Sequence, residues 1–182
     1  MYQIVDNTWI SKTRDFATRV CNAYQMGKKE HSKSLALDGK PEIHNDTRVQ
    51  FVGRIGEIAA CLAFKLDPNI ALNWSDTCDN GSDFVYLGQT YDVKSTDHPK
   101  AKRLIWPKSK THFMIKAADV FIMAKVRLDT FEADVDLVGY TTKHKFFKAC
   151  KYASGEPGIV DGTPYMLDNE LSPLEDIINV EA

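Results

Sequence analysis

The fold of this protein is decided by residues 49–64, which read VQFVGRIGEIAACLAF. The part after Glu57 is apolar on every side, which predicts a helix that is buried nearly all round. Asp46 or Thr47 can cap its N-terminus, and Thr47 with Gln50 has the spacing of a capping box. We therefore expect a central helix that packs against most of the remaining core.

Two glycines interrupt this predicted helix. Gly53 and Gly56 each cost about 1 kcal/mol relative to alanine in a helix interior. Close packing of the helix against another backbone would explain both of them.

Upstream of this segment, an apolar stripe with a spacing of four predicts another helix over residues 9–26. The stripe consists of Phe16, Val20 and Tyr24. Thr8 or Ser11 can cap this helix and Gly27 can end it. The polar stretch 34–46 that follows contains Asp-Gly-Lys-Pro, which is typical of a loop.

Downstream, a turn-rich stretch at 73–82 precedes a predicted hairpin. The hairpin strands, 83–86 and 91–94, are short and alternate around the turn residues 87–90. The continuous apolar run 118–126 is typical of a buried central strand.

The C-terminal third predicts a strand and two helical segments. Residues 131–140 alternate, with Val135 and Leu137 on one face, and a short helix covers 143–150. The sequence from Ser172 predicts a last helical turn, with serine as N-cap and glutamate at the capping-box position. Together the elements predict a mixed α/β fold with one central mixed β-sheet flanked by helices.

The composition is that of a globular protein. The chain has 182 residues, of which 43% are hydrophobic and 26% charged, so we expect a single domain over 1–182 rather than a disordered or fibrous chain. No apolar run approaches the roughly 20 residues that cross a bilayer, and the N-terminus does not resemble a secretory signal. The cysteines have no zinc-ligand spacing, which favours reduced thiols in a soluble intracellular protein. They are Cys21, Cys61, Cys78 and Cys150.

The net charge of −2 conceals an asymmetry along the chain. Seven basic residues lie between Lys94 and Lys116 against a single acid, Asp97, whereas no Lys or Arg follows Lys151. A polyanion could therefore bind to one local surface. The alternative interpretation of the basic stretch is a solvated loop.

The predicted hairpin groups three charged side chains. A two-residue turn at 87–88 would pair Asp83 with Asp92, and a turn at 88–89 would pair Asp83 with Lys94. Because side chains alternate along a strand, either register places all three on one face. A three-residue loop would break this arrangement.

Two carboxylates across a hairpin repel each other, by roughly 0.2–1 kcal/mol. A bound divalent cation reverses the sign of that interaction, and carboxylate oxygens suit Mg²⁺. Lys94 would point at the same site, where an ammonium can stabilise a phosphate or orient an attacking water.

Glu57 requires a separate argument. It lies opposite the main apolar stripe of its helix, which by itself favours a structural, solvent-facing position. However, Cys61 and Phe64 share its face, and a carboxylate in apolar surroundings is costly unless it is paired or bound to a metal. The helix alone leaves both interpretations open.

The ordered set formed by these residues closely resembles the PD-(D/E)XK nuclease superfamily, which has the restriction-endonuclease-like fold. The motif residues are Gly53-x-x-Gly56-Glu57, Asp83 and Asp92-Val93-Lys94. The resemblance covers residues 47–178, which we expect to form the nuclease-like core, with 1–46 as an N-terminal helix and loop extension. Small phage and prophage-type nucleases are the most similar members. Ser82 replaces the proline of the motif, and the step from Asp83 to Asp92 is short.

The resemblance implies a metal-dependent deoxyribonuclease, expected to act as an endonuclease. Asp83 and Asp92 would ligate Mg²⁺, or Mn²⁺ as a substitute, together with the backbone carbonyl of Val93. Glu57 would hold a second metal ion or its water, and Lys94 would serve the water nucleophile. A catalytically silent nucleic-acid-binding module and a nuclease that acts on RNA are the alternatives.

The basic stretch would then contact the DNA backbone without reading sequence. The residues expected to do so are Lys100, Lys102, Arg103, Lys108 and Lys110. Trp106, among these residues, could stack on an unpaired base or belong to the core. The resemblance places the protein in the cytoplasm of a bacterial or phage-infected cell. Symmetric cutting of a duplex would favour a homodimer.

Overall fold

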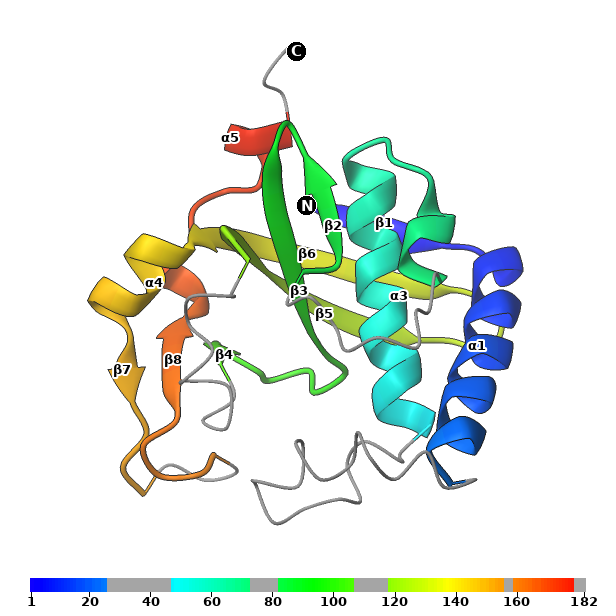
Figure 1. The fold of residues 1–182 in the computed structure, drawn as a ribbon, viewed down its shortest axis with the longest axis horizontal. Helices are drawn as coiled ribbons and strands as arrows, with labels where there is room; N and C mark the ends of the chain where they lie inside the picture. Colours follow the sequence, from blue (N-terminus) through cyan, green and yellow to red (C-terminus); the bar gives the residue numbers. More distant parts are fainter. Residues whose placement is uncertain (26–46, 73–81, 107–117, 156–158, 179–182) are drawn as a thin grey trace.

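The structure, a computed structural model, describes residues 1–25, 47–72, 82–106, 118–155 and 159–178 (Figure 1). A five-stranded mixed sheet forms its centre. The strands of this sheet are β1 (Tyr2–Val5), β2 (Phe84–Tyr86), β3 (Gln89–Thr96), β5 (Val120–Leu128) and β6 (Ala133–Thr142), in the spatial order β1-β6-β5-β3-β2. A small antiparallel sheet contains β4 (Arg103–Ile105), β8 (Pro164–Leu167) and β7 (Lys151–Tyr152), in that order.

Four α-helices and two short 3-10 helices complete the part of the chain that the structure describes. The α-helices are α1 (Asn7–Gln25), α3 (Thr47–Ala63), α4 (Lys143–Ala149) and α5 (Glu175–Ile178); the 3-10 helices are η3 (Pro68–Leu72) and η5 (Asp168–Glu170). The predicted mixed α/β class is confirmed, but the small second sheet was not predicted. None of the described helices is long and apolar enough to span a membrane.

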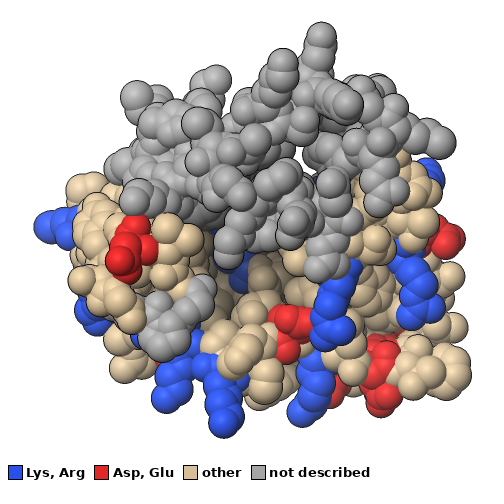
Figure 2. Space-filling view, turned by 90° about the horizontal axis from the view of Figure 1, so that it is seen from below, with Lys and Arg blue, Asp and Glu red and all other residues tan. Residues whose placement is uncertain are grey.

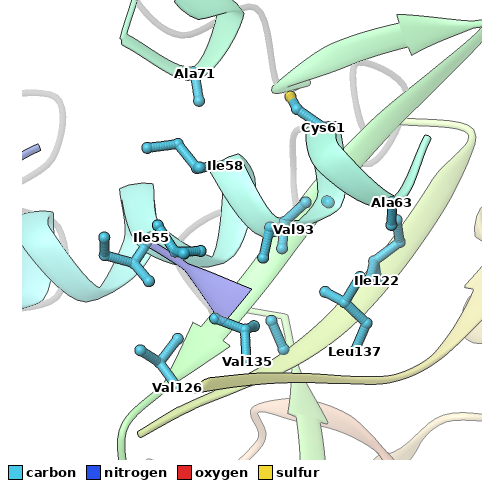
Figure 3. Packing of buried hydrophobic residues seen from close by; sticks show 14 of the residues in the cluster. Ile55, Ile58, Cys61, Ala63, Ala71, Val93, Ile122, Val126, Val135 and Leu137 are labelled. Carbon is cyan, nitrogen blue, oxygen red and sulfur yellow. The ribbon is translucent and has the colours of Figure 1, made fainter. Parts of the chain in front are cut away.

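Helix α3 matches the prediction closely. Every residue from Ile55 to Cys61 is buried, and the helix lies between α1 and the central sheet (Figure 1). Ile55 and Ile58 extend into an aliphatic cluster that includes Val93 and Ile122 of the sheet (Figure 3). The helix therefore covers one face of the central sheet.

The two glycines of α3 behave differently. A methyl group on Gly56 would lie 3.0 Å from the Cβ of Ser95 and 3.2 Å from the Cβ of Ala124, so the predicted close packing is present there, although the nearest atoms belong to side chains and not to another backbone. A methyl group on Gly53 would meet nothing within 4 Å, so the same explanation is wrong for Gly53. Instead, the Gly53 carbonyl accepts a hydrogen bond from Ser95 Oγ at 3.3 Å.

The N-terminal segment differs from the prediction at its start. Asp6 caps α1 by accepting hydrogen bonds from the backbone N–H groups of Thr8 and Trp9, at 2.9 and 3.3 Å, so the expected caps Thr8 and Ser11 are wrong. Before this cap, β1 pairs antiparallel with β6 at the sheet edge. The first residues therefore complete the central sheet.

The opposite face of the central sheet is covered by the small sheet and α4. Phe121 and Met123 of β5 point to this side, where they pack with Leu104 and Met166 of the small sheet and with Phe146 of α4. Alternation along β5 thus divides the core into two clusters, one on each face of the sheet. Val135 and Leu137 of β6 share one face of the strand, as predicted, and both belong to the cluster under α3.

The hairpin of β2 and β3 has the first of the two predicted registers. Phe84 pairs with Tyr91 and Tyr86 with Gln89, which leaves Leu87 and Gly88 as a two-residue turn. Both turn residues have positive φ, +46° and +77°, as a type I′ turn requires.

Several predicted features lie outside the described residues. These are the loop 34–46, most of the turn-rich stretch 73–82, Asp46 and Cys78. Ser172, expected to cap the last helical turn, instead forms a backbone bridge with Tyr140 of β6, and α5 begins at Glu175. Cys21, Cys61 and Cys150 are free thiols.

Candidate active site

The candidate site lies at the edge of β3, beside the start of β2. The backbone N–H of Asp83 donates to the carbonyl of Tyr91 at 2.7 Å, and Asp83 Oδ2 accepts from the N–H of Val93 at 2.7 Å. In a strand, the N–H and C=O of one residue point to the same side, so the Val93 carbonyl also faces this edge. A carboxylate and a backbone carbonyl are thereby brought to one place.

Asp92 and Lys94 lie on the same face of β3, as the alternation predicts. Lys94 Nζ is 2.7 Å from Asp92 Oδ1 and 2.6 Å from Oδ2, and Asp92 is only 6% exposed. Tyr91 and Val93 point to the other face, where Tyr91 stacks on Phe84 with ring centroids 5.0 Å apart. The side chains of Asp92 and Lys94 therefore project away from α3, toward the cluster of Trp106, Phe121 and Phe146 on the other face of the sheet.

Trp106, in this cluster, contacts the ammonium of Lys94. Lys94 Nζ lies 5.5 Å from the centre of the Trp106 ring, within the range of a cation–π interaction. Trp106 is 4% exposed and packs against Phe121 and Phe147, with ring centroids 5.0 and 5.8 Å apart. Of the two interpretations of Trp106, the core position is confirmed, because a buried ring cannot stack on a base.

Glu57 is buried, with 7% of its surface exposed, so the solvent-facing interpretation is wrong. It forms an ion pair with Arg54, three residues earlier in α3. The guanidinium of Arg54 in turn lies 5.2 Å from the centre of the Phe16 ring in α1. The sequence analysis missed Arg54, although a spacing of three in a helix places Arg54 and Glu57 side by side.

The pKa values indicate that the three carboxylates lie close together. Burial, followed by the negative charges of Glu57 and Asp92, raises the pKa of Asp83 well above its usual value, and Lys94 opposes this effect. Burial, with smaller contributions from Glu57 and Asp83, raises the pKa of the Cys61 thiol to about 12. Cys61 is therefore a buried, protonated thiol and no candidate nucleophile.

The residues present fit a small divalent cation. In the described part of the chain, no group of three or more His, Cys, Asp or Glu residues is arranged to hold a metal ion, so Glu57, Asp83 and Asp92 do not form one ligand set. Asp83, Asp92 and the Val93 carbonyl offer hard oxygen donors, and Mg²⁺ commonly binds through one or two carboxylates and several waters. A cation there would also oppose the burial and the carboxylate repulsion that together raise the pKa of Asp83.

The basic residues proposed for DNA binding are only partly described. Lys100 and Lys102 are exposed, whereas the guanidinium of Arg103 lies 5.1 Å from the centre of the Tyr165 ring. Lys108 and Lys110 lie outside the described residues. Figure 2 shows the molecule from below the view of Figure 1, and on this face the Lys and Arg side chains of the described residues are interspersed with acidic ones.

The chain matches no protein-family model, and comparisons with curated proteins and with solved structures found no match. An interpretation of the site therefore depends on its own geometry and chemistry. The elements that matter are the carboxylates at the open edge of β3 and the lysine held beside them.

Proposed function

We propose that this protein is a Mg²⁺-dependent nuclease of the PD-(D/E)XK type that hydrolyses phosphodiester bonds in DNA. The observation that carries the proposal is the grouping of Asp83, Asp92 and Lys94 at one edge of the hairpin, with Glu57 close by. The ordered motif that resembles the superfamily supports the same conclusion.

Asp83 and Asp92, with the Val93 carbonyl, are the residues that would hold Mg²⁺. When bound, the ion supplies Lewis acidity at a phosphate oxygen and lowers the pKa of a water molecule. The burial of Asp92 keeps competing water away from this carboxylate and strengthens its electrostatic interactions.

Lys94 supplies the second part of the chemistry. Asp92 and the Trp106 ring hold its ammonium in one position, so it can donate a hydrogen bond to a phosphate oxygen as charge develops there. A donor that is already fixed in place loses little orientational freedom during the reaction. Glu57 is a carboxylate able to accept a hydrogen bond from the attacking water.

Lys100, Lys102, Arg103, Lys108 and Lys110 are the proposed contacts to the DNA backbone. Each phosphate contact adds to the salt dependence of binding, so affinity falls steeply as salt rises. Contacts of this kind carry no sequence information.

The first test is the cleavage of supercoiled plasmid and of labelled single-stranded and branched DNA in Mg²⁺, Mn²⁺ or EDTA. We expect cutting that requires the metal and that falls by about 10²–10⁴-fold in Asp92→Asn and in Lys94→Met. Lys125→Met is the matched control, since Lys125 is also a half-buried lysine in an ion pair, with Asp168 at 3.1 Å.

Two results would contradict the proposal. Cutting that survives both substitutions would mean that the active site lies elsewhere. Absence of cutting by the folded protein on every DNA would direct the same assay to RNA. If RNA is also left intact, retained DNA binding would favour the catalytically silent module.

A further inference from the structure

The charges around the candidate site do not balance. Two of the three carboxylates have a cation of their own: Glu57 pairs with Arg54, and Asp92 pairs with Lys94. Asp83 instead accepts from a backbone N–H, and no described Lys or Arg forms an ion pair with it. Among the carboxylates, Lys and Arg that the structure describes here, one negative charge is therefore in excess, and it lies at Asp83.

Arg54 is firmly held where it is. Its guanidinium pairs with Glu57 on one side and lies over the buried ring of Phe16 on the other. A cation over an aromatic ring is favourable, more so when water is excluded. An ion bound at Glu57 would have to displace this guanidinium and leave it in a partly buried position without its carboxylate, which is costly.

We propose that the site takes one divalent cation, at Asp83 and Asp92, and that Arg54 remains on Glu57 as a fixed second positive charge. This inference rests on the proposed function and specifies its metal requirement. One divalent cation would turn the excess negative charge into a single positive charge, suited to a phosphate, whereas two would leave a large positive excess. The positions of Glu57, Asp83 and Asp92 are consistent with a single ion, because the described residues hold no group of three such side chains arranged around a metal site.

Arg54 is then a positioning residue that acts through Glu57. It also gives the N-terminal helix a role, because Phe16 of α1 holds the guanidinium against α3. The sequence-based expectation that Glu57 holds a second metal ion is replaced by a protein cation in this arrangement.

The test titrates the full chain with Mn²⁺ in the absence of DNA. Electron paramagnetic resonance measures the free Mn²⁺, and the difference from the total gives the number of ions bound per chain. We expect one ion per chain in the wild type. Arg54→Gln should bind Mn²⁺ at least about fivefold more tightly, because a positive charge near the ion is removed. Arg48→Gln is the matched control: Arg48 lies on the same helix and pairs with Asp97 at 2.6 Å, and its loss should leave the affinity unchanged.

A further variant protects the test against misfolding. Arg54→Gln/Glu57→Gln removes both charges together, and we expect it to bind one Mn²⁺ with an affinity within about threefold of the wild type. Its thermal unfolding, followed by circular dichroism, checks that the fold is intact.

The outcomes separate the two proposals. Three results would each overturn the one-ion inference alone. They are two Mn²⁺ ions per wild-type chain, an unchanged Mn²⁺ affinity in folded Arg54→Gln, and a loss of Mn²⁺ affinity of tenfold or more in the double variant. A wild type that binds no Mn²⁺ would overturn the metal-dependent function as well.

Discussion

The two faces of the central sheet are built from different residues. The face under α3 is built around aliphatic side chains, with Gly56 allowing the helix to approach Ala124, and it also holds the packed rings of Phe64, Phe84 and Tyr91. The face under the small sheet and α4 is aromatic, with Trp106 and Phe121 among its buried rings. The second face also lies beside a charge, because the ammonium of Lys94 is 5.5 Å from the centre of the Trp106 ring.

This difference suggests that the first face contributes mainly to the stability of the fold, and the second to the position of the Lys94 ammonium. Where a helix approaches a sheet over small residues, the backbones are buried close together and a larger side chain cannot be accommodated. Aromatic rings fill space and also attract a cation through their faces. The candidate site lies at the edge where both faces are within reach, with Glu57 from the aliphatic side and Lys94 on the aromatic side.

The largest expected effect compares adjacent residues of β5 that point to opposite faces. Ile122→Ala and Phe121→Ala should each lower the free energy of unfolding by about 2–5 kcal/mol, because both side chains are fully buried. Denaturant unfolding measures this. If the protein is the proposed nuclease, then of the milder variants Ile122→Val and Phe121→Leu only Phe121→Leu should slow cleavage, since Phe121 packs against Trp106. Equal slowing in both would remove the division between the faces.

The second prediction sharpens the description of the aliphatic face. Gly56→Ala should cost about 1–3 kcal/mol by overpacking against Ser95 and Ala124. Gly53→Ala, in the same helix, should stabilise by up to about 1 kcal/mol, because its methyl group meets open space. Thermal unfolding of both variants tests the pair. Adding Ser95→Ala should restore part of the loss in Gly56→Ala, and no recovery would contradict the close approach.

The third prediction concerns the aromatic face and rests on the proposed function. Trp106→Leu should lower kcat by about 3- to 30-fold with little change in KM, since a cation–π interaction contributes about 0.5–2 kcal/mol. Trp106→Phe should recover much of the loss because it restores a ring. Phe147→Leu is the comparison, because it disturbs only the packing of Trp106, as Phe121→Leu does, and should lower kcat less than Trp106→Leu. A loss in Phe147→Leu as large as in Trp106→Leu would indicate packing alone.

The smallest effect concerns the small sheet that covers the aromatic face. Lys151, at 2.7 Å, and the N–H of Leu167, at 2.8 Å, lower the pKa of Glu170 below its ordinary value of 4.5. A lowered carboxylate pKa stabilises the fold above pH 4.5, and this stability is lost as the pH falls through the folded-state pKa.

Glu170→Gln should therefore cost about 0.2–1 kcal/mol at pH 7, a small value because the ion pair is exposed to solvent. The difference from the wild type should disappear in unfolding experiments at progressively lower pH. A difference that persists at the lowest pH at which both proteins fold would mean that the charge is not its source.

The longer elements could be predicted from the sequence because their patterns are long. Helix α3, β5, β6 and α4 all carry runs of several apolar or alternating residues. The hairpin turn was predicted only to one of two registers, both of which contain Gly88. Strands β4, β7 and β8 have two to four residues each, too few for a periodicity to be recognised. Strand β1 is also only four residues long, and its pairing with β6 depends on residues near the other end of the chain, such as Asp136 opposite Tyr2.

The site was predicted as far as local spacing allowed. Asp83, Asp92 and Lys94 could be grouped because strand alternation and a two-residue turn determine their faces. Arg54 was not singled out, and Trp106 was left between base stacking and a core position, because their importance depends on tertiary contacts with Phe16 and Phe121. The burial of Glu57 was left open for a similar reason.

The pairing of β1 with β6 also has a consequence for the kinetics of folding. Tyr2 lies opposite Asp136, and the chain must close this long loop before the sheet is complete. Contacts between such distant residues form slowly, on timescales of milliseconds to seconds in folds rich in them. Until β1 docks, β6 presents an unpaired edge, so refolding at high protein concentration should lose material to aggregation through that strand.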